Sequence, residues 1–411
     1  MKFYVETFGC KVNAYESNFI KQSLLANDFL YVSNMIDADI IIINTCTVTN
    51  AADSKCKKYV RRVRRENKDS ILVVMGCSVQ NNFDVYNEMD IDILLGNNKK
   101  SEIVSILKEY LNTNEKYSYI TNNRDLDFEN MKIDSFNHTR AFIKIQDGCD
   151  NFCAYCIIPF VRGKCRSKDF DEIINEANNL VTHGHKEIVL TGIHTGSYNC
   201  NGKDLVDVIN ELTKINGLQR IRLSSVEITE LNDKFMGMLE NNSKFCDHLH
   251  VPLQAGSDEI LKAMNRKYDL SYFEEKIKEI RKIRPNISIT TDIIVGFPGE
   301  TNEMFESTYD FSNKIKFSKI HVFPYSKRNG TVASKLKEVN DTEKTNRVHK
   351  LIELSNILEK EYESKFYNKD VEVLVEEVKD NFSIGHTSNY LKVTVDEMLE
   401  TNEIYNVIFT K

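Results

Sequence analysis

Three cysteines lie within one short stretch of the chain. The sequence DGCDNFCAYC, residues 147–156, contains Cys149, Cys153 and Cys156 in the spacing C-x3-C-x2-C, and the aromatic Tyr155 stands directly before the last of them. Structural zinc sites usually take four protein ligands, and iron-sulfur clusters also take about four. Three thiolates from one loop can hold one metal centre and leave a coordination position open, whereas three thiols cannot all pair into disulfides. The stretch therefore predicts a metal centre with room for a further ligand.

A second set of three cysteines follows three predicted strands. The strands are KFYVETFGC, DIIIINTC and SILVVMGC, at residues 2–10, 39–46 and 70–77. They are rich in Val, Ile and aromatic residues, and helical patterns at about 16–29 and 51–68 separate them, which predicts an open parallel sheet. Because ligands gather beyond the carboxyl ends of parallel strands, we expect Cys10, Cys46 and Cys77 to form a second three-thiolate site.

A longer alternation of strands and helices begins at about residue 138. Its six predicted strands span residues 140–146, 187–193, 220–226, 248–254, 287–296 and 319–325. Six such units predict a partial (βα)6 barrel, open where a full eight-stranded barrel would close. In barrels of this type the chemistry lies at the C-terminal ends of the strands, and the loop with Cys149 directly follows the first strand.

The chain divides into three predicted domains, within the two or three that 411 residues suggest at about 150 residues each. An N-terminal cluster domain (1–112) precedes a polar linker (113–137) rich in Asn, Asp and Lys. The barrel domain (138–366) ends in a charged helix, and the tail (367–411) has the alternating polarity typical of strands. The predicted fold class is therefore α/β, with an N-terminal open parallel sheet, a partial barrel and a small C-terminal β-barrel.

The composition is that of a globular protein, with 41% hydrophobic and 28% charged residues. The N-terminus lacks the pattern of a signal peptide, and no apolar run approaches the roughly 18 residues that would cross a bilayer. We therefore expect a cytoplasmic protein with no membrane partner. Because the cytosol keeps thiols reduced, the ten cysteines predict metal ligands, catalysts or buried thiols and not a disulfide framework.

The cysteine loop DGCDNFCAYC resembles that of radical S-adenosylmethionine (SAM) enzymes. Longer fragments resemble one family among them, the methylthiotransferases: ETFGCKVNAYES, NTCTVTNAA, CIIPFVRG, PLQAGS and DIIVGFPGET. That family has an N-terminal cluster domain, a radical SAM barrel and a C-terminal TRAM domain that binds RNA. The resemblance thus implies two 4Fe-4S clusters, SAM as cofactor, and a TRAM-like RNA-binding tail.

The resemblance also implies roles for individual residues. Cys149, Cys153 and Cys156 would hold the cluster whose open iron binds SAM, and Tyr155 would lie against the adenosyl group. Cys10, Cys46 and Cys77 would hold the cluster that carries the inserted sulfur. In this fold glycine-rich loops approach the cofactor at strand ends, so the candidates for further SAM contacts are Gly192, Gln254 and Asp292. The remaining cysteines, expected not to be ligands, are Cys56, Cys165, Cys200 and Cys246. His194 and His250 are expected to be structural.

The first cluster loop implies a substrate. FGCKVNAYES resembles the form found in methylthiotransferases of threonylcarbamoyladenosine in tRNA, whereas the isopentenyladenosine enzymes more often have YGCQMN and the ribosomal-protein enzymes LGCPKN. The expected reaction is methylthiolation of C2 of this nucleoside at position 37, in the anticodon stem-loop of tRNA. An electron donor and a sulfur source would be further partners. A threonylcarbamoyl carboxylate needs a cationic partner if it is partly buried, and Lys11 and Arg162 are the candidates.

RNA contacts are also indicated by a basic stretch. KCKKYVRRVRRENK, residues 55–68, holds eight basic residues in fourteen on a predicted helix, although the net charge of the chain is -7. The stretch is either a solvated helix face or a row of phosphate contacts. Three alternatives to the expected function stay open: a methylthiotransferase of isopentenyladenosine-tRNA, one acting on a ribosomal-protein aspartate, and a zinc-stabilised RNA-binding protein without catalysis.

Overall fold

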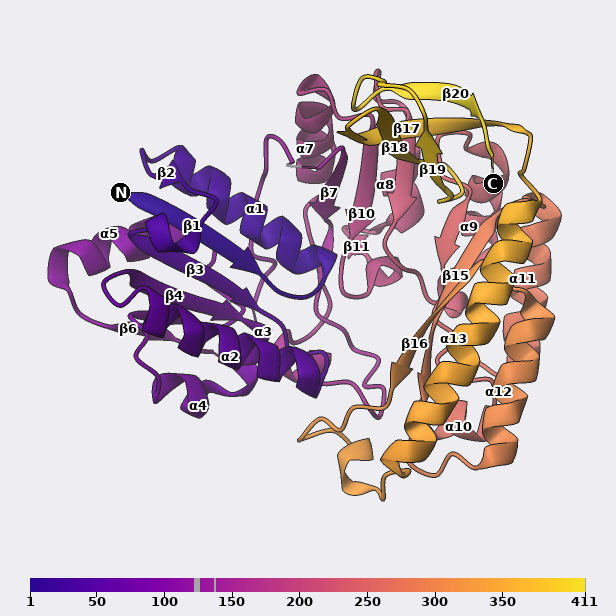
Figure 1. The fold of residues 1–411 in the computed structure, drawn as a ribbon, viewed down its shortest axis with the longest axis horizontal. Coiled ribbons are helices and arrows are strands. Elements are labelled where there is room, and N and C mark those ends of the chain that lie inside the picture. The colour runs from indigo at the N-terminus through magenta and orange to yellow at the C-terminus, as the bar shows by residue number, and fades with distance from the viewer. Residues whose placement is uncertain (122–125, 137, 411) are drawn as a thin grey trace.

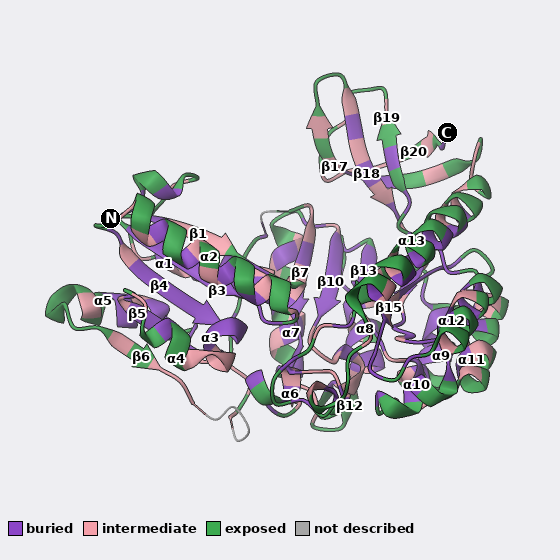
Figure 2. Cartoon of the chain, turned by 60° about the horizontal axis from the view of Figure 1, so that its bottom comes forward, coloured by how far each residue is buried: buried purple, intermediate pink, exposed green. Residues whose placement is uncertain are grey.

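The protein consists of an N-terminal α/β unit, a larger α/β unit and a small C-terminal sheet (Figure 1). The structure, a computed structural model, describes residues 1–121, 126–136 and 138–410. In both α/β units the strands are mostly buried, and the helices turn their exposed faces outward (Figure 2). In the described part of the chain, no helix has the length and apolar character needed to cross a membrane.

The N-terminal unit is built on a six-stranded parallel sheet of order β2-β1-β3-β4-β5-β6. Its strands are β1 (Lys2–Thr7), β2 (Leu30–Tyr31), β3 (Ile40–Thr45), β4 (Ile71–Gly76), β5 (Ile93–Leu95) and β6 (Tyr117–Tyr119). Its helices are α1 (Lys11–Leu25), α2 (Asn50–Glu66), α3 (Cys77–Asn81), α4 (Phe83–Asn87) and α5 (Ile103–Thr113). The predicted open parallel sheet is confirmed, and β6 adds an edge strand from within the segment expected to be a linker.

Helices cover both faces of this sheet because its central strands are apolar on both sides. Ile40 and Ile42 of β3 pack in one cluster with residues of α1 and α5. Ile41 and Ile43 pack in the opposite cluster with residues of α2. The alternation follows from the two-residue period of a strand, and burial on both faces explains the continuous Ile and Val runs.

The larger unit is a six-stranded partial barrel made of two parallel sheets, of order β13-β10-β7 and β14-β15-β16. Its strands are β7 (Arg140–Lys144), β10 (Glu187–Thr191), β13 (Arg220–Leu223), β14 (His248–His250), β15 (Ser288–Val295) and β16 (Lys319–Pro324). A parallel bridge between Ile221 and Phe245 joins the two sheets. The predicted partial (βα)6 barrel is confirmed.

The helices of this unit are α6 (Ile158–Val161), α7 (Phe170–Thr182), α8 (Leu205–Thr213), α9 (Asp233–Asn241), α10 (Asp258–Ala263), α11 (Leu270–Ile283), α12 (Asn302–Ile315) and α13 (Asp341–Ser364). Its short strand pairs are β8 (Gln146–Asp147) with β9 (Arg166–Ser167), and β11 (Asn199–Cys200) with β12 (Lys203–Asp204). The long helix α13 lies along β16, next to α12 (Figure 1).

The inner face of the barrel is polar, unlike the packed apolar interior of a closed barrel. On β15, Ile289 and Ile293 belong to the apolar core that includes the surrounding helices. The alternate residues Thr290, Asp292 and Ile294 line cavities instead. A partial barrel with this lining has room for polar ligands along its axis.

The C-terminal sheet contains four antiparallel strands in the order β19-β18-β17-β20. They are β17 (Asp370–Lys379), β18 (Phe382–Thr387), β19 (Lys392–Val395) and β20 (Ile404–Ile408). The strand-rich tail is as predicted, with the strands forming a curled half-barrel sheet. Two barrel arginines anchor it: Arg220 donates hydrogen bonds to the carbonyls of Glu372 and His386, and Arg222 donates to the carbonyls of Thr387 and Ser388.

Candidate active site

The loop with Cys149, Cys153 and Cys156 follows β8 at the C-terminal end of the barrel strands. Gly148 precedes it with a φ of +75°, and a Cβ there would lie 1.9 Å from the carbonyl oxygen of Lys164, so only glycine fits. Backbone hydrogen bonds hold the loop from two further segments: Cys149 N–H donates to Gly163 O, and Ala154 N–H to Met264 O. Contacts of the backbone with neighbouring segments therefore hold the loop in place.

The three loop thiols are half-buried, and the guanidinium of Arg266 lies next to one of them. The Arg266 guanidinium donates to Cys153 Sγ at 3.3 Å and is itself paired with Glu227. Burial raises the pKa of Cys156 to about 12, so the thiol needs a metal to become a thiolate at neutral pH. Hydrogen bonds to cluster sulfurs are one means by which a protein stabilises an iron-sulfur cluster. The residues present therefore fit such a cluster.

His194 is a further neighbour of this loop. It pairs with Glu230, and although burial lowers the pKa of His194, contacts with Cys149, Cys165 and Glu230 raise it to about 12. Sequence reasoning treated this histidine as structural. Its position three residues after β10, at the active end of the barrel, was the signal that could have indicated it.

A cavity of about 200 Å³ adjoins the loop. Tyr155 and Cys156 line it together with Gln254 and Asp292, which sequence reasoning named as SAM contacts. Gly192 is not among the residues that line this cavity. It lies against Gln146, whose side-chain oxygen would be 3.0 Å from a Cβ at position 192. Three of the four predicted contacts are thus together, and Gly192 instead allows the strand-end turn to approach Gln146.

The second triad lies at the carboxyl ends of β1, β3 and β4. Cys10 is the N-cap of α1, Cys46 directly follows β3, and Cys77 begins α3. Gly9 has a φ of +101°, and a Cβ there would lie 2.6 Å from Cys46 Sγ, so the glycine permits the first loop to approach the second. Burial raises the pKa of Cys46 to about 12. The sheet brings together three thiols that are far apart in the sequence.

Within the described residues, no group of three or more His, Cys, Asp and Glu side chains is placed to hold a single metal ion.

The two triads adjoin each other. Cys77 packs against Ile157, the residue after Cys156. Val48 and Thr49, which follow Cys46 closely, line the cavity beside the barrel loop together with Tyr155. The cavity is thus formed by both α/β units.

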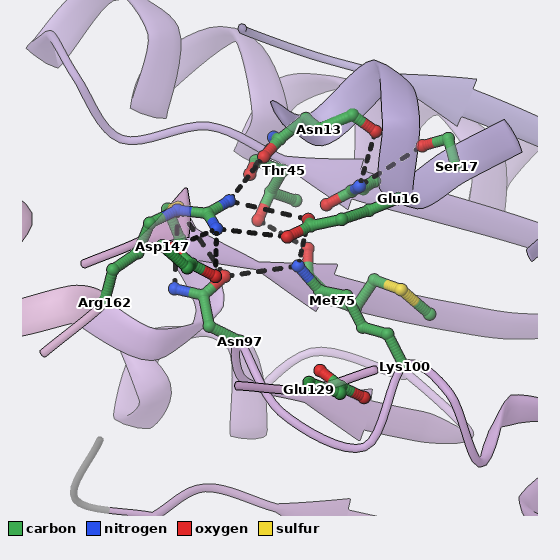
Figure 3. A network of polar contacts seen from close by, with 12 residues as sticks. Asn13, Glu16, Ser17, Thr45, Met75, Asn97, Lys100, Glu129, Asp147 and Arg162 are labelled. Carbon is green, nitrogen blue, oxygen red and sulfur yellow. Dashed lines mark hydrogen bonds and ion pairs between the residues drawn. The ribbon is translucent and has the colours of Figure 1, made fainter. Parts of the chain in front are cut away.

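A buried network of charges centres on Arg162, just beyond the barrel loop (Figure 3). The Arg162 guanidinium donates to Glu16 and Asp147 at 3.0 Å each, and its Nε donates to Cys77 Sγ at 3.2 Å. Lys144 binds the same two carboxylates at 2.9 and 2.6 Å, and Lys100 also binds Glu16. The network joins α1, which begins after Cys10, to β7 and β8, which lead to the loop with Cys149.

The network carries more positive than negative charge. Arg162, Lys100 and Lys144 face the two carboxylates of Glu16 and Asp147, and all five side chains are at least 94% buried. Burial would raise the pKa of Glu16, but the charges of these three cations hold it well below its usual range.

Arg162 is therefore not the partner of a substrate carboxylate, and that expectation is wrong. Its side chain is completely buried, and its nitrogens already bond to Cys77, Glu16, Asp147 and Asn13. Its place in the sequence just after the cysteine loop suggested that it lies near the substrate. In the structure its guanidinium is instead used by Glu16 and Asp147, which come from other segments of the chain.

The other cysteines differ in their surroundings. Cys56 lies in α2, buried, and its sulfur accepts a hydrogen bond from Cys46 N–H at 3.4 Å. Cys165 lies 3.3 Å from the Ser197 hydroxyl, and Cys246 is buried. Cys200 is half-buried, 3.9 Å from a carboxylate oxygen of Asp169.

Two family descriptions match the chain in succession. Residues 2–96 match "Uncharacterized protein family UPF0004", and residues 143–312 match the Radical SAM superfamily. The first covers the sheet with Cys10, Cys46 and Cys77, and the second covers the barrel from its first strand through α12.

Similar proteins match over almost the whole chain. The threonylcarbamoyladenosine tRNA methylthiotransferase MtaB of Bacillus subtilis (strain 168) is 40% identical over 94% of this chain and 88% of its own length. That of Aquifex aeolicus (strain VF5) is 36% identical over 99% and 100%. The tRNA-2-methylthio-N(6)-dimethylallyladenosine synthase of Carboxydothermus hydrogenoformans is 35% identical over 91% and 88%.

A solved structure shares the fold. The radical S-adenosylmethionine methyltransferase TsrM from Kitasatospora setae, solved with cobalamin and a [4Fe-4S] cluster bound, superposes with a TM-score of 0.61. It covers 81% of this chain and 77% of its own, at 12% sequence identity. At that identity the likeness establishes the fold alone.

Proposed function

The chain belongs to the methylthiotransferase family of radical SAM enzymes, and on that premise we propose that it methylthiolates C2 of N6-threonylcarbamoyladenosine at position 37 of tRNA. Family membership implies SAM and a 4Fe-4S cluster. We further propose two 4Fe-4S clusters, one on Cys149, Cys153 and Cys156 and the other on Cys10, Cys46 and Cys77. When bound, the clusters and SAM supply the electron, the radical, the sulfur and the methyl group.

One observation carries this proposal: one cavity is lined by residues close to both triads. Tyr155 and Cys156 line it from the barrel side, and Val48 and Thr49, two and three residues after Cys46, line it from the other. A methylthiolation must bring one carbon of the substrate to a radical source and to a sulfur source. Sites on either side of a shared cavity meet this requirement, whereas two structural metal sites would have no need of it.

The residues of the chain have separable tasks in this scheme. Tyr155, Gln254 and Asp292 would orient SAM in the cavity beside the barrel loop, since they line it. Arg266 and Arg162 would stabilise the charge at Cys153 and Cys77 by hydrogen bonds to their sulfurs. The apolar walls formed by Ile294 and its neighbours would exclude water from this cavity.

The choice of nucleoside rests on resemblance. The first two relatives described above carry the threonylcarbamoyladenosine name, and the loop FGCKVNAYES resembles their form. A relative named for dimethylallyladenosine is 35% identical, so overall similarity discriminates weakly between the two substrates. We propose tRNA as the partner, contacted by the basic stretch 55–68 and by the C-terminal sheet.

The test offers the reconstituted full-length enzyme two tRNAs, one with threonylcarbamoyladenosine and one with isopentenyladenosine at position 37. Mass spectrometry of the digested nucleosides should show a methylthio group on the first. Product from the isopentenyl substrate alone would overturn the choice of nucleoside and leave the reaction class intact. No product from either tRNA, in a protein that contains zinc and no iron, would support the non-catalytic alternative.

A further inference from the structure

A second cavity, of about 460 Å³, lies deeper in the partial barrel. Its walls come from β13, β14, β15 and β16, from α13, and from the C-terminal sheet around Tyr390. Lys11, at the start of α1, is the lining residue from the N-terminal unit. All three parts of the protein therefore contribute to one cavity.

Residues of this cavity neighbour residues of both proposed cluster sites. Lys11 directly follows Cys10 of the N-terminal triad. His250 lines the cavity, and its Nε2 lies 3.3 Å from the carboxylate of Asp292, which lines the cavity beside the cysteine loop. Thr290 and Asp292 are alternate residues on the same face of β15, so the two cavities follow each other along that strand.

Three polar groups in this cavity have no protein partner. The Ser224 hydroxyl and His248 Nδ1 are buried without a hydrogen bond. Of the described carboxylates, none lies within ion-pair distance of Lys11. Buried polar atoms are nearly always paired, and His248 is 94% buried. These unpaired groups indicate a polar ligand with at least one negative charge.

The contacts around His248 leave one ring nitrogen free. The Thr290 hydroxyl oxygen lies 2.8 Å from His250 Nδ1 and 3.1 Å from His248 Nε2, so it links the two rings. His248 Nδ1 is left for a hydrogen bond with a polar group of a ligand.

We propose that this cavity binds the N6-threonylcarbamoyl group of the substrate nucleoside, with its carboxylate on Lys11. The Ser224 hydroxyl donates a second hydrogen bond to the carboxylate, and His248 Nδ1 forms one with another polar atom of the group. The inference deepens the proposed function and rests on it. It assigns substrate discrimination to the partial barrel together with the residue after Cys10.

The lining favours this group over the alternatives. An isopentenyl group needs apolar walls, but Leu391 is the single aliphatic residue of the described lining, which otherwise consists of two tyrosines and of polar or charged residues, with Glu359 and Glu363 among them. The side chain of Arg222 is paired with Glu187 and that of Lys319 with Glu359, and Lys392 is exposed on β19. Lys11, which directly follows Cys10, is therefore the cation that matches one carboxylate on the reacting nucleoside.

The test measures binding and does not depend on turnover. Anticodon stem-loop RNAs carry threonylcarbamoyladenosine, its methyl ester, or isopentenyladenosine at position 37, and fluorescence anisotropy gives their affinities for the full chain with its clusters. We expect wild type to bind the acid at least about tenfold more tightly than the ester. In Lys11→Met this preference should disappear, and in Lys11→Arg most of it should remain.

Controls separate the possible failures. Lys314→Met removes a lysine from the outer helix α12 and should leave the preference unchanged. Ser224→Ala should reduce the preference for the acid over the ester by a smaller factor. Because Ser224 is remote in sequence from the cluster cysteines, this variant keeps the test valid if Lys11→Met loses iron. If Lys11→Met weakens binding of acid and ester equally, Lys11 contacts an RNA phosphate and the inference is overturned. If wild type makes no methylthio product from the acid RNA, the proposed function fails instead.

Discussion

The two cysteine triads lie near the same cavity, which is lined by Cys156 and by residues shortly after Cys46, but they are built in opposite ways. Cys149, Cys153 and Cys156 come from one loop, whose backbone is held by neighbouring segments of the same barrel. Cys10, Cys46 and Cys77 come from three strand ends and meet only when the N-terminal sheet has formed. The first arrangement depends on local spacing, and the second depends on tertiary structure.

Each triad nevertheless has one arginine at one of its sulfurs. Arg266 donates to Cys153 from within the barrel unit, where it pairs with Glu227. Arg162 donates to Cys77 across the boundary between the two units and binds Glu16 on α1. The N-terminal site is thus completed by the barrel, whereas the barrel site is complete in itself. This asymmetry can be tested.

The largest expected effect comes from removing each triad in turn. Changing Cys149, Cys153 and Cys156 to Ala should abolish reductive cleavage of SAM and leave about half of the iron, if two equal clusters are each held by three cysteines. Changing the other triad to Ala should also remove about half of the iron, but SAM cleavage should persist without methylthio product.

The measurements are iron content and 5'-deoxyadenosine formed per enzyme. Replacing both Cys200 and Cys246, which lie outside the triads, provides the control and should leave iron unchanged. Equal iron in wild type and in both triple variants would end the two-cluster model.

The next effect concerns the arginine that crosses between the units. Arg162→Gln leaves Glu16 and Asp147 with fewer cations and removes a hydrogen bond to Cys77. Breaking a buried ion pair costs about 3–5 kcal/mol, so the free energy of unfolding of the apo-protein should fall by about that amount. Denaturant unfolding measures it.

The matched variant Arg266→Gln acts on the other triad. It should lower the iron bound by the barrel triad and leave the iron bound by the N-terminal triad unchanged. Each site is measured separately by adding Arg266→Gln to the triple variant that lacks the other triad. If Arg162→Gln also depleted only the barrel cluster, the asymmetry between the two sites would be refuted.

Sequence reasoning predicted the local features of this comparison well. The spacing of the barrel cysteines is visible in ten residues, and the Ile and Val runs of β3 and β4 indicate buried parallel strands. The convergence of Cys10, Cys46 and Cys77 at one sheet edge followed from the topology of parallel sheets.

The charge network could not be predicted in this way. Glu16, Lys100 and Arg162 are separated by dozens of residues, and no periodic pattern links a single Glu in a helix to an arginine of another unit. For the same reason the sequence left Arg162 as a candidate partner of the substrate carboxylate. Arg266 reaches the loop by a tertiary contact that leaves no spacing signal, whereas the place of His194 just after a barrel strand was visible in the sequence.

A smaller effect should be seen with pH. Burial opposes ionisation of Glu16, but Arg162, Lys100 and Lys144 hold its pKa below the usual range. The ionised carboxylate therefore contributes stability above its unfolded pKa of about 4.3 and loses it as pH falls through the folded value. The difference in unfolding free energy between apo wild type and Glu16→Gln should shrink below about pH 4. A difference independent of pH would show that the pKa of Glu16 is the same in the folded and the unfolded protein, and would contradict the role given to the three cations.

The smallest effect concerns RNA, which the N-terminal unit contacts in our proposal through α2. Lys58, Arg61 and Arg65 are exposed on this helix, whereas Arg64 is occupied by Asp92 and by backbone carbonyls. Changing the three exposed residues to Gln should weaken tRNA binding and flatten the dependence of log K on log salt by roughly 0.7–0.9 for each phosphate that is no longer neutralised. SAM cleavage without tRNA should not change, because the barrel triad is complete in itself.

A triple Gln variant of Lys276, Lys278 and Lys282 on the outer helix α11 removes the same charge and should leave the slope as in wild type. An equal reduction of slope in both variants would mean that RNA responds only to net charge, and α2 would then be a solvated face.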